Sequence, residues 1–221
     1  MARTSRVEKA RTRERLVETA SHEFRANGVA GTSIPTLMER IGLTHGTFYA
    51  HFDSKDALVA EAYARGLNET VERLLHRAET APPGRALNAV IDRYLSAEHR
   101  DDPAGGCVLP ALAGEVRREP AEVRQAFTEE LRRYFDRLAP LLPDQDARAR
   151  ADHELILASG MVGAVLLARA VDDPALSDRI LDACRNFYTA AFTAPADAES
   201  MNDEQQRTTP VVGGASARRG E

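Results

Sequence analysis

Apolar residues recur at three- and four-residue spacing along almost the whole chain, and this periodicity restricts the possible fold more than any other feature. Leu16, Ala20 and Phe24 follow it near the start, and residues 87–95 and 127–138 repeat it later. Such spacing places apolar side chains on one face of an α-helix. No run alternates apolar and polar residues with the period of two that marks a half-buried strand. The chain is therefore predicted to be all-α.

Helix start and stop signals set the expected boundaries. The first helix should end at residues 27–28, Asn-Gly. Ser33 is the expected N-cap of a short helix, and a second short helix should run from Thr44 to Asp53. Ser54 should cap a long helix that the sequence Ala-Pro-Pro-Gly closes at residues 81–84. Later helices are expected over 87–95, 109–116, 121–138, 152–171 and 175–192.

These elements group into two regions. A compact three-helix unit is expected over residues 1–53, followed by a larger helical body over 54–194, and 221 residues suffice for two modest cores. Residues 195–221 have almost nothing to bury, so a disordered tail is expected there.

The composition argues against several classes of protein. A net charge of -5 argues against a globally basic nucleic-acid coat protein. Cys107 and Cys184 lack C-x-x-C spacing, so neither a disulfide framework, a metal site nor a cofactor is predicted. The charged N-terminus is unlike a signal peptide, and the apolar run 155–168 is shorter than the ~20 residues of a membrane span. We expect a cytoplasmic protein without a membrane partner.

Residues 43–58, LTHGTFYAHFDSKDAL, crowd three aromatic rings between two histidines. On a helix of about 100° per residue, Phe48 and Phe52 share one face and can pack inward. His45 and Tyr49 flank the opposite face. That face carries the short or polar residues Gly46, Thr47, Ala50 and His51. A surface that is shallow in the middle and rimmed by hydrogen-bonding groups suits the major groove of DNA.

The helix over residues 33–41, the break at 42–44 and the helix that follows have the lengths of a helix-turn-helix. Charge supports this interpretation, because the first fifteen residues hold six Arg or Lys against two Glu in an acidic chain. Two interpretations of this basic end stay open: a solvated, disordered arm and a reader of the minor groove.

The stretch GTSIPTLMERIGLTHGTFYAHFDSKDAL resembles the DNA-binding domain of the TetR (tetracycline-repressor-like) family. The shared features are a Thr/Ser-rich entry to the second helix, a Gly turn, a G-T-x-Y-x-H-F recognition helix and a following S/N-K. The resemblance implies a dimeric repressor that a small-molecule effector releases from a palindromic double-stranded DNA operator. It places His45 and Thr47 nearest to base edges. It also implies phosphate contacts from Ser33, Thr44, Tyr49, His51 and Lys55.

The last two helices are candidates for a homodimer interface. SGMVGAVLLARAV, residues 159–171, is apolar on all sides, and small residues there would let a partner helix approach closely. A buried core within one subunit is the alternative, and the resemblance favours a four-helix interface. The candidate residues are Gly160, Gly163, Ala164, Phe187 and Tyr188.

The stretch RYLSAEHRDDPAGGCVLPALAGEVRREP resembles TetR-type repressors of operons that detoxify electrophiles. Cys107 should fall near a helix N-terminus, since Pro110 can only occupy a first turn. Positive charge there, increased by His99 or Arg100, would lower the thiol pKa. Cys107 is thus an effector-sensing candidate, expected to react faster than Cys184. A small buried core residue is the alternative.

The sequence disfavours two other functions. An all-helical enzyme is disfavoured because the chain has no Gly-rich phosphate loop, no metal-ligand cluster and no G-x-S-x-G elbow. Glu98, His99 and Asp101 are expected to face solvent in a polar connector. A constitutive DNA-organising protein would not need so large a helical body. A ligand-responsive regulator is therefore favoured.

Overall fold

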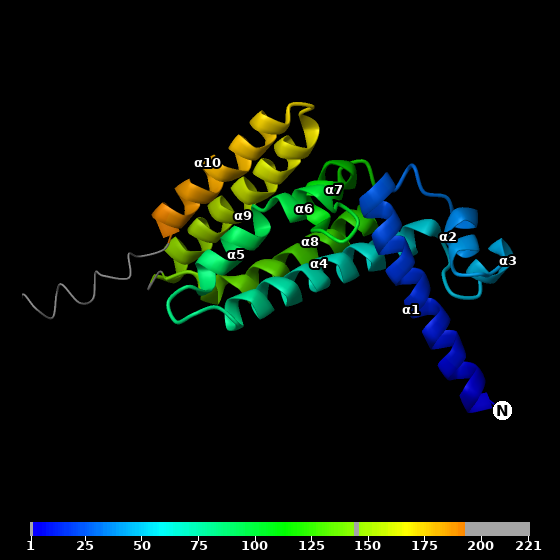
Figure 1. Cartoon of the computed structure of the whole chain (residues 1–221). Coiled ribbons are helices and arrows are strands. Elements are labelled where there is room, and N and C mark those ends of the chain that lie inside the picture. The colour runs from blue at the N-terminus through cyan, green and yellow to red at the C-terminus, as the bar shows by residue number, and fades with distance from the viewer. Residues whose placement is uncertain (1, 144–145, 193–221) are drawn as a thin grey trace, which may run out of the picture.

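A computed structural model describes residues 2–143 and 146–192, with side chains described from residue 6 onward. Every regular element in these ranges is a helix, so the all-α prediction is confirmed there (Figure 1). The tail expected over 195–221 lies outside the described residues. The elements are α1 (Ala2–Asn27), α2 (Ile34–Arg40), α3 (His45–Phe48), α4 (Lys55–Glu79), α5 (Ala86–Tyr94), α6 (Ala97–Asp101), α7 (Val108–Val116), α8 (Ala121–Leu138), the 3-10 turn η1 (Ala139–Leu141), α9 (Ala147–Ala170) and α10 (Pro174–Phe192).

Local capping chemistry explains why most boundaries were predictable. The Ser33 hydroxyl accepts the Thr36 N–H at 3.3 Å, and the Ser54 hydroxyl accepts the Ala57 N–H at 3.1 Å. Gly28 ends α1 with a φ of 75°, a left-handed conformation that residues with a Cβ rarely adopt. These caps depend on neighbouring residues alone, so the sequence reveals them.

The observed helices differ from the expected ones in three respects. The second helix of the helix-turn-helix spans only His45–Phe48, because the next backbone bonds, from Ala50 to Thr47 and from His51 to Phe48, form tight i to i−3 turns. The basic N-terminal segment is helical from Ala2 onward and not a disordered arm. The connector over 97–101 contains α6, which is too short to show a period.

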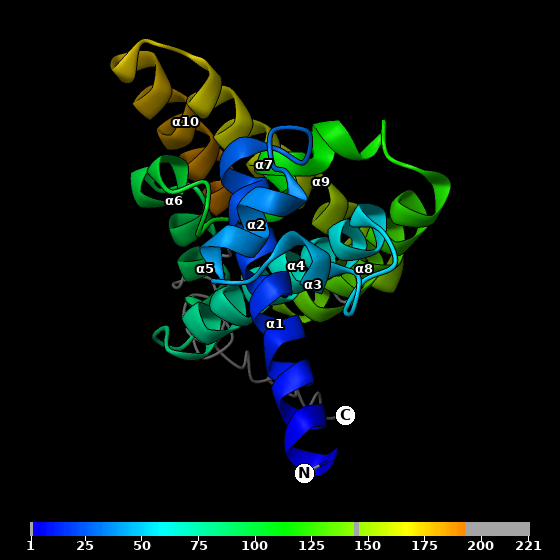
Figure 2. The ribbon, with the colours of Figure 1, turned by 90° about the vertical axis from the view of Figure 1, so that its right-hand side faces the viewer.

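The head, α1 to α3, forms one end of the continuous apolar core of the chain. Leu16, Phe24, Leu37 and Phe48 are fully buried in it. α4 leaves the head and runs the length of the body between α1, α5 and α8, while α9 and α10 pair on the far side (Figure 1). Figure 2 looks at the head directly, with α2 and α3 in front of the body. The short helices are thus free to meet a partner.

Within the described residues, α9 is the one helix long and apolar enough to cross a membrane by length and composition alone. The apolar run 155–168 is shorter than a span, but α9 continues two turns further towards its N-terminus. Core helices pass the same test. α9 packs on α7 and α10 and buries Leu157, Met161 and Val165, so contacts inside the subunit account for part of its apolar composition.

Candidate DNA interface and effector pocket

The outer surface of α3 has the shape that the sequence predicted. Thr44, His45 and Gly46 are exposed, and a Cβ added to Gly46 would meet no atom within 4 Å. The Thr44 and Thr47 hydroxyls lie 3.0 Å apart. Tyr49 is 58% exposed, and its ring meets that of His45 edge to face with centroids 5.6 Å apart. Hydrogen-bonding groups therefore surround a bare stretch of backbone, and their contacts with bases stay a prediction.

Ser33 and His51 lie at two edges of this surface. Ser33 is exposed at the start of α2, where its hydroxyl also contacts the Thr36 hydroxyl at 2.8 Å. His51 is half-buried beside α1, and burial together with the positive charges of Lys9 and Arg13 lowers its imidazole pKa. A neutral imidazole donates one N–H. His51 can still donate to a phosphate, without contributing a charge.

Lys55 has a role that the sequence did not reveal. Its ammonium donates to the backbone carbonyls of Val29 and Thr32, both at 2.6 Å. It therefore fastens the start of α4 to the loop between α1 and α2. Two of its three N–H groups are occupied by these carbonyls, so a phosphate could receive one at most.

Lys55→Met should lower the free energy of unfolding by about 1–3 kcal/mol, because two carbonyls lose a charged donor. It should leave the salt dependence of DNA binding nearly unchanged. Urea unfolding and a salt titration of DNA affinity measure the two effects, and Lys9→Met on exposed α1 is the control for the unfolding measurement, where it should change little. A salt slope reduced by about one at unaltered stability would instead show that Lys55 binds a phosphate.

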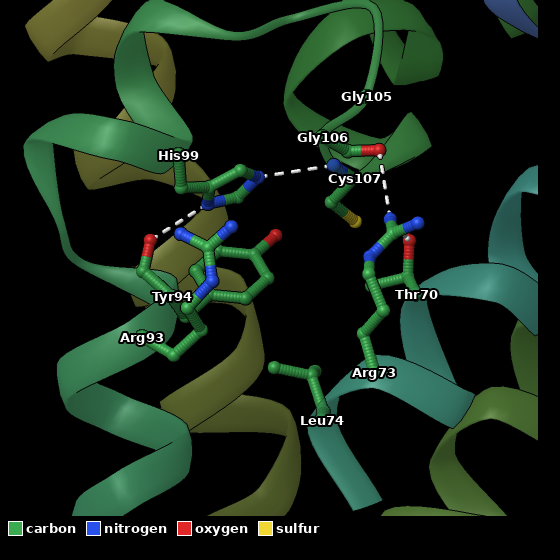
Figure 3. A pocket seen from close by; sticks show the side chains of 9 residues that line it. All are labelled: Thr70, Arg73, Leu74, Arg93, Tyr94, His99, Gly105, Gly106 and Cys107. Carbon is green, nitrogen blue, oxygen red and sulfur yellow. Dashed lines mark hydrogen bonds between the residues drawn. The ribbon is translucent and has the colours of Figure 1, made fainter. Parts of the chain in front are cut away.

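A cavity lies in the body behind the head, between α4, α5 and the loop before α7 (Figure 3). It encloses about 300 Å³, part of it open to solvent. Its lining consists of Thr70, Arg73, Leu74, Arg93, Tyr94, His99, Gly105, Gly106 and Cys107. We call this the Cys107 pocket. Two of its side chains are arginines, which suits a ligand with polar or acidic groups.

His99 forms one wall of the Cys107 pocket and does not face solvent, which corrects the expectation for it. It is 6% exposed, its Nδ1 lies 2.7 Å from the Tyr94 carbonyl, and its Nε2 accepts the Cys107 N–H at 3.0 Å. Since a carbonyl only accepts, Nδ1 must carry the proton. Burial lowers the His99 pKa to about 4, so the ring is neutral and offers Cys107 no positive charge.

Cys107 is the N-cap of α7, as its sequence neighbours indicated. Its Sγ accepts the Leu109 N–H at 3.4 Å, and the residue is only 1% exposed. Burial raises the pKa of the thiol and outweighs the hydrogen bonds that lower it, so the expected low pKa is wrong. The Tyr94 hydroxyl is buried beside the Cys107 thiol, and Figure 3 shows it and the sulfur directed into the same space. The Tyr94 hydroxyl and the Cys107 sulfur could both contact a bound ligand.

One carbonyl of this pocket is hydrogen-bonded to the head. The Gly106 carbonyl accepts from Arg25 Nη1 of α1 at 3.0 Å and from Arg73 Nη2 of α4 at 3.3 Å. The Arg25 side chain is 1% exposed and also contacts Glu69 at 3.3 Å. At the other end of α7, Glu115 accepts the Val29 N–H at 2.9 Å. α7 and the loop directly before it therefore hold the head at two points.

α9 and α10 divide the predicted interface residues between two environments. A Cβ on Gly160 would overlap the Tyr188 hydroxyl, and Ala164 is 4% exposed. Both positions contact helices of their own subunit, and their contact with a partner stays a prediction. Gly163 has open space beside it, and Phe187 is 63% exposed. Other large apolar residues on the outer surface of α9 are Leu155, Ile156, Leu166 and Leu167.

Comparisons agree with this architecture. Residues 16–62 match the model of bacterial regulatory proteins of the tetR family, and residues 83–184 that of the tetracyclin repressor-like C-terminal domain. An uncharacterised HTH-type transcriptional regulator of Mycobacterium tuberculosis is 30% identical over 80% of this chain and 94% of that protein. HTH-type transcriptional regulator TtgR of Pseudomonas putida is 35% identical over 36% of this chain, and the match spans only 38% of TtgR. A TetR-family regulator from Cytophaga hutchinsonii superposes with a TM-score of 0.70 at 21% identity, covering 85% of this chain and 98% of that one.

An exposed helix-turn-helix joined to a helical body defines a DNA-binding transcriptional regulator. The family-model matches over both halves of the chain identify the family of this regulator. The chain belongs to the TetR family of bacterial transcriptional regulators. It is not an enzyme, as the sequence predicted. Among residues 6–143 and 146–192, no group of three or more His, Cys, Asp or Glu could hold a metal ion.

Proposed function

We propose that this chain is a cytoplasmic homodimeric repressor that a small molecule in the Cys107 pocket releases from a palindromic operator. Residues 1–53 would bind DNA, and residues 54–194 would bind the ligand and form the dimer. The observation that carries the proposal is the Gly106 carbonyl, which lines the pocket and accepts a hydrogen bond from buried Arg25 of the head.

DNA recognition would use the exposed surface of α3 and the start of α2. One such unit covers about half of a specific site, so a symmetric dimer supplies the second unit about 34 Å away, or at a multiple of one helical turn. The exposed apolar residues of α9 and α10 support a dimer through these helices. Exposed apolar side chains this close together are typical of protein interfaces.

Release would follow from movement of the loop before α7. A ligand in contact with Cys107 and Tyr94 lies beside Gly106, and rotation of the Gly106 carbonyl would break its bond to Arg25. The head would then be held less firmly in the orientation that suits the operator. A ligand that favours this second orientation shifts the population of dimers away from DNA.

Two classes of effector fit the Cys107 pocket. The first is a reversible ligand with polar or acidic groups, supported by Arg73, Arg93 and the buried Tyr94 hydroxyl. Solved structures of the same fold contain small molecules of varied chemistry, stearoyl-CoA in FadR of Bacillus subtilis and choline in a putative transcriptional regulator of Saccharomonospora viridis. The second class is an electrophile that bonds to Cys107, whose sulfur faces the cavity in Figure 3. Burial of Cys107 and the raised pKa of its thiol favour the reversible class of effector.

N-ethylmaleimide separates these classes. At pH 7.5 the folded protein should react at Cys184 at least about tenfold faster than at Cys107, because Cys184 is half-buried and Cys107 almost inaccessible. This reverses the order expected from the sequence. Mass spectrometry of digests after timed quenching measures both rates, and unfolded protein is the control. Faster labelling of Cys107 would establish the electrophile class.

The same reagent tests whether the pocket controls DNA binding. Prolonged labelling of a Cys184→Ser variant places the adduct on Cys107, and operator affinity should fall at least about tenfold. In the matched Cys107→Ser variant the adduct lies on Cys184, and affinity should stay unchanged. Fluorescence anisotropy with a labelled operator measures both. Full affinity with Cys107 modified would show that the pocket is not coupled to the head.

A further inference from the structure

We propose that a second cavity, between α5, α8 and α9, binds an organic amine with an apolar body. The space between its lining side chains measures about 320 Å³, part of it open to solvent, and the cavity shares no residue with the Cys107 pocket. We call it the Glu154 cavity. Leu87, Tyr134, Leu138, Leu141, Leu142, Glu154, Leu157, Ala158 and Met161 line it.

Glu154 is the feature of this cavity that requires an explanation. It lies on α9, is 8% exposed, and its Oε1 is buried without a hydrogen-bond partner in the described parts of the chain. A buried polar atom without a partner costs free energy, and a buried charge costs much more. Burial, aided by the nearby negative charge of Asp136, raises the Glu154 pKa to about 7. The protein thus keeps a carboxyl group poorly compensated in an apolar space.

A ligand can supply what Glu154 lacks. An ammonium group donates up to three N–H bonds and carries the charge that favours the carboxylate, so its bond to Oε1 would be charge-assisted. The Tyr134 ring is buried at the same cavity, and aromatic faces attract cations. The other lining side chains are apolar and would enclose a hydrocarbon chain or ring. One cationic nitrogen on an apolar body therefore fits, whereas an anion would face a carboxyl group.

The position of the Glu154 cavity separates this inference from the proposed function. α5 and α9 lie at the end of the body opposite to α2 and α3 (Figure 1). A ligand there would touch α8, which packs along α4, so a signal to the head is feasible but rests on the proposed function. Binding itself does not. Amine binding is therefore tested without DNA, and absence of binding would leave the operator experiments unaffected.

Isothermal titration of the full chain at pH 7.5 compares three probes with the same eight-carbon chain: n-octylamine, octan-1-ol and octanoate. The amine should bind at least about tenfold more tightly than the alcohol, and octanoate should bind most weakly. Glu154→Gln keeps the size of the side chain and removes its charge. It should reduce amine affinity to that of the alcohol and change alcohol affinity by less than about twofold.

Two further variants exclude indirect effects. Ala158→Leu fills the cavity and should abolish binding of both amine and alcohol, while Glu129→Gln removes an exposed carboxylate of α8 and should change neither. Glu154→Gln should also fold well, since it replaces a carboxyl whose burial opposes ionisation. Equal affinity for amine and alcohol, or amine binding that Glu154→Gln or Ala158→Leu leaves intact, would overturn the proposal.

Discussion

Leu167→Arg combined with Phe187→Arg is expected to convert the dimer into monomers and to weaken operator binding by at least about 100-fold. Both side chains lie on the outer surface of the subunit, 58% and 63% exposed, so arginine there should leave the monomer folded. In a dimer through α9 and α10, the substitutions would bring positive charges together where apolar surface is buried. A monomer then binds a half-site alone.

Sedimentation equilibrium measures the association state, and anisotropy with a duplex operator measures affinity. The matched control is Gln125→Arg with Thr128→Arg, which adds the same two charges on exposed positions of α8. This control should remain dimeric and bind at least as well as wild type. A Leu167→Arg, Phe187→Arg protein that remains dimeric would place the interface elsewhere.

Arg25→Met should have the second-largest effect. It should lower the free energy of unfolding and remove the response of operator binding to labelling of Cys107. The Arg25 guanidinium is buried between Gly106 and Glu69, so its loss leaves both with a vacant hydrogen-bonding position. Removing one partner of a buried charged contact costs about 3–5 kcal/mol. Urea unfolding should show a loss near the lower limit, because Glu69 keeps its bond to Arg65 at 2.7 Å.

Arg25→Met should also uncouple the pocket from the head. The variant, made in the Cys184→Ser background, should bind operator similarly before and after labelling of Cys107, at a temperature where it is folded. Arg65→Met is the control, since Arg65 contacts the same Glu69 from a more exposed position and should keep the response. Unaltered release in the Arg25 variant would mean that the signal travels by another route.

The sequence predicted features that depend on near neighbours. Ser33 and Ser54 cap helices because their hydroxyls reach N–H groups three residues away, and Cys107 begins α7 for a similarly local reason. The composition of residues 43–58 indicated the exposed surface of the helix-turn-helix, because its inward and outward residues differ in kind.

Features that depend on distant contacts were not predictable. The resemblance assigned Lys55 to a phosphate, and nothing in the sequence places its ammonium beside the carbonyls of Val29 and Thr32. His99 looked solvent-facing in a polar stretch, and only packing of the short α6 buries its ring. Nothing in the sequence singles out Arg25, whose partners Gly106 and Glu69 lie far along the chain. The burial that raises the Cys107 pKa likewise comes from elements far away in the sequence.

Selection from a pool of random DNA duplexes, followed by footprinting of the selected sequence, tests the central claim most directly. Two helix-turn-helix units in a symmetric dimer should select an inverted repeat, with half-site centres about 10 bp or a multiple of one turn apart. Affinity for it should exceed that for random DNA at least about 1,000-fold at physiological salt. Selection that yields no common sequence, or a single half-site bound by a monomer, would contradict the account.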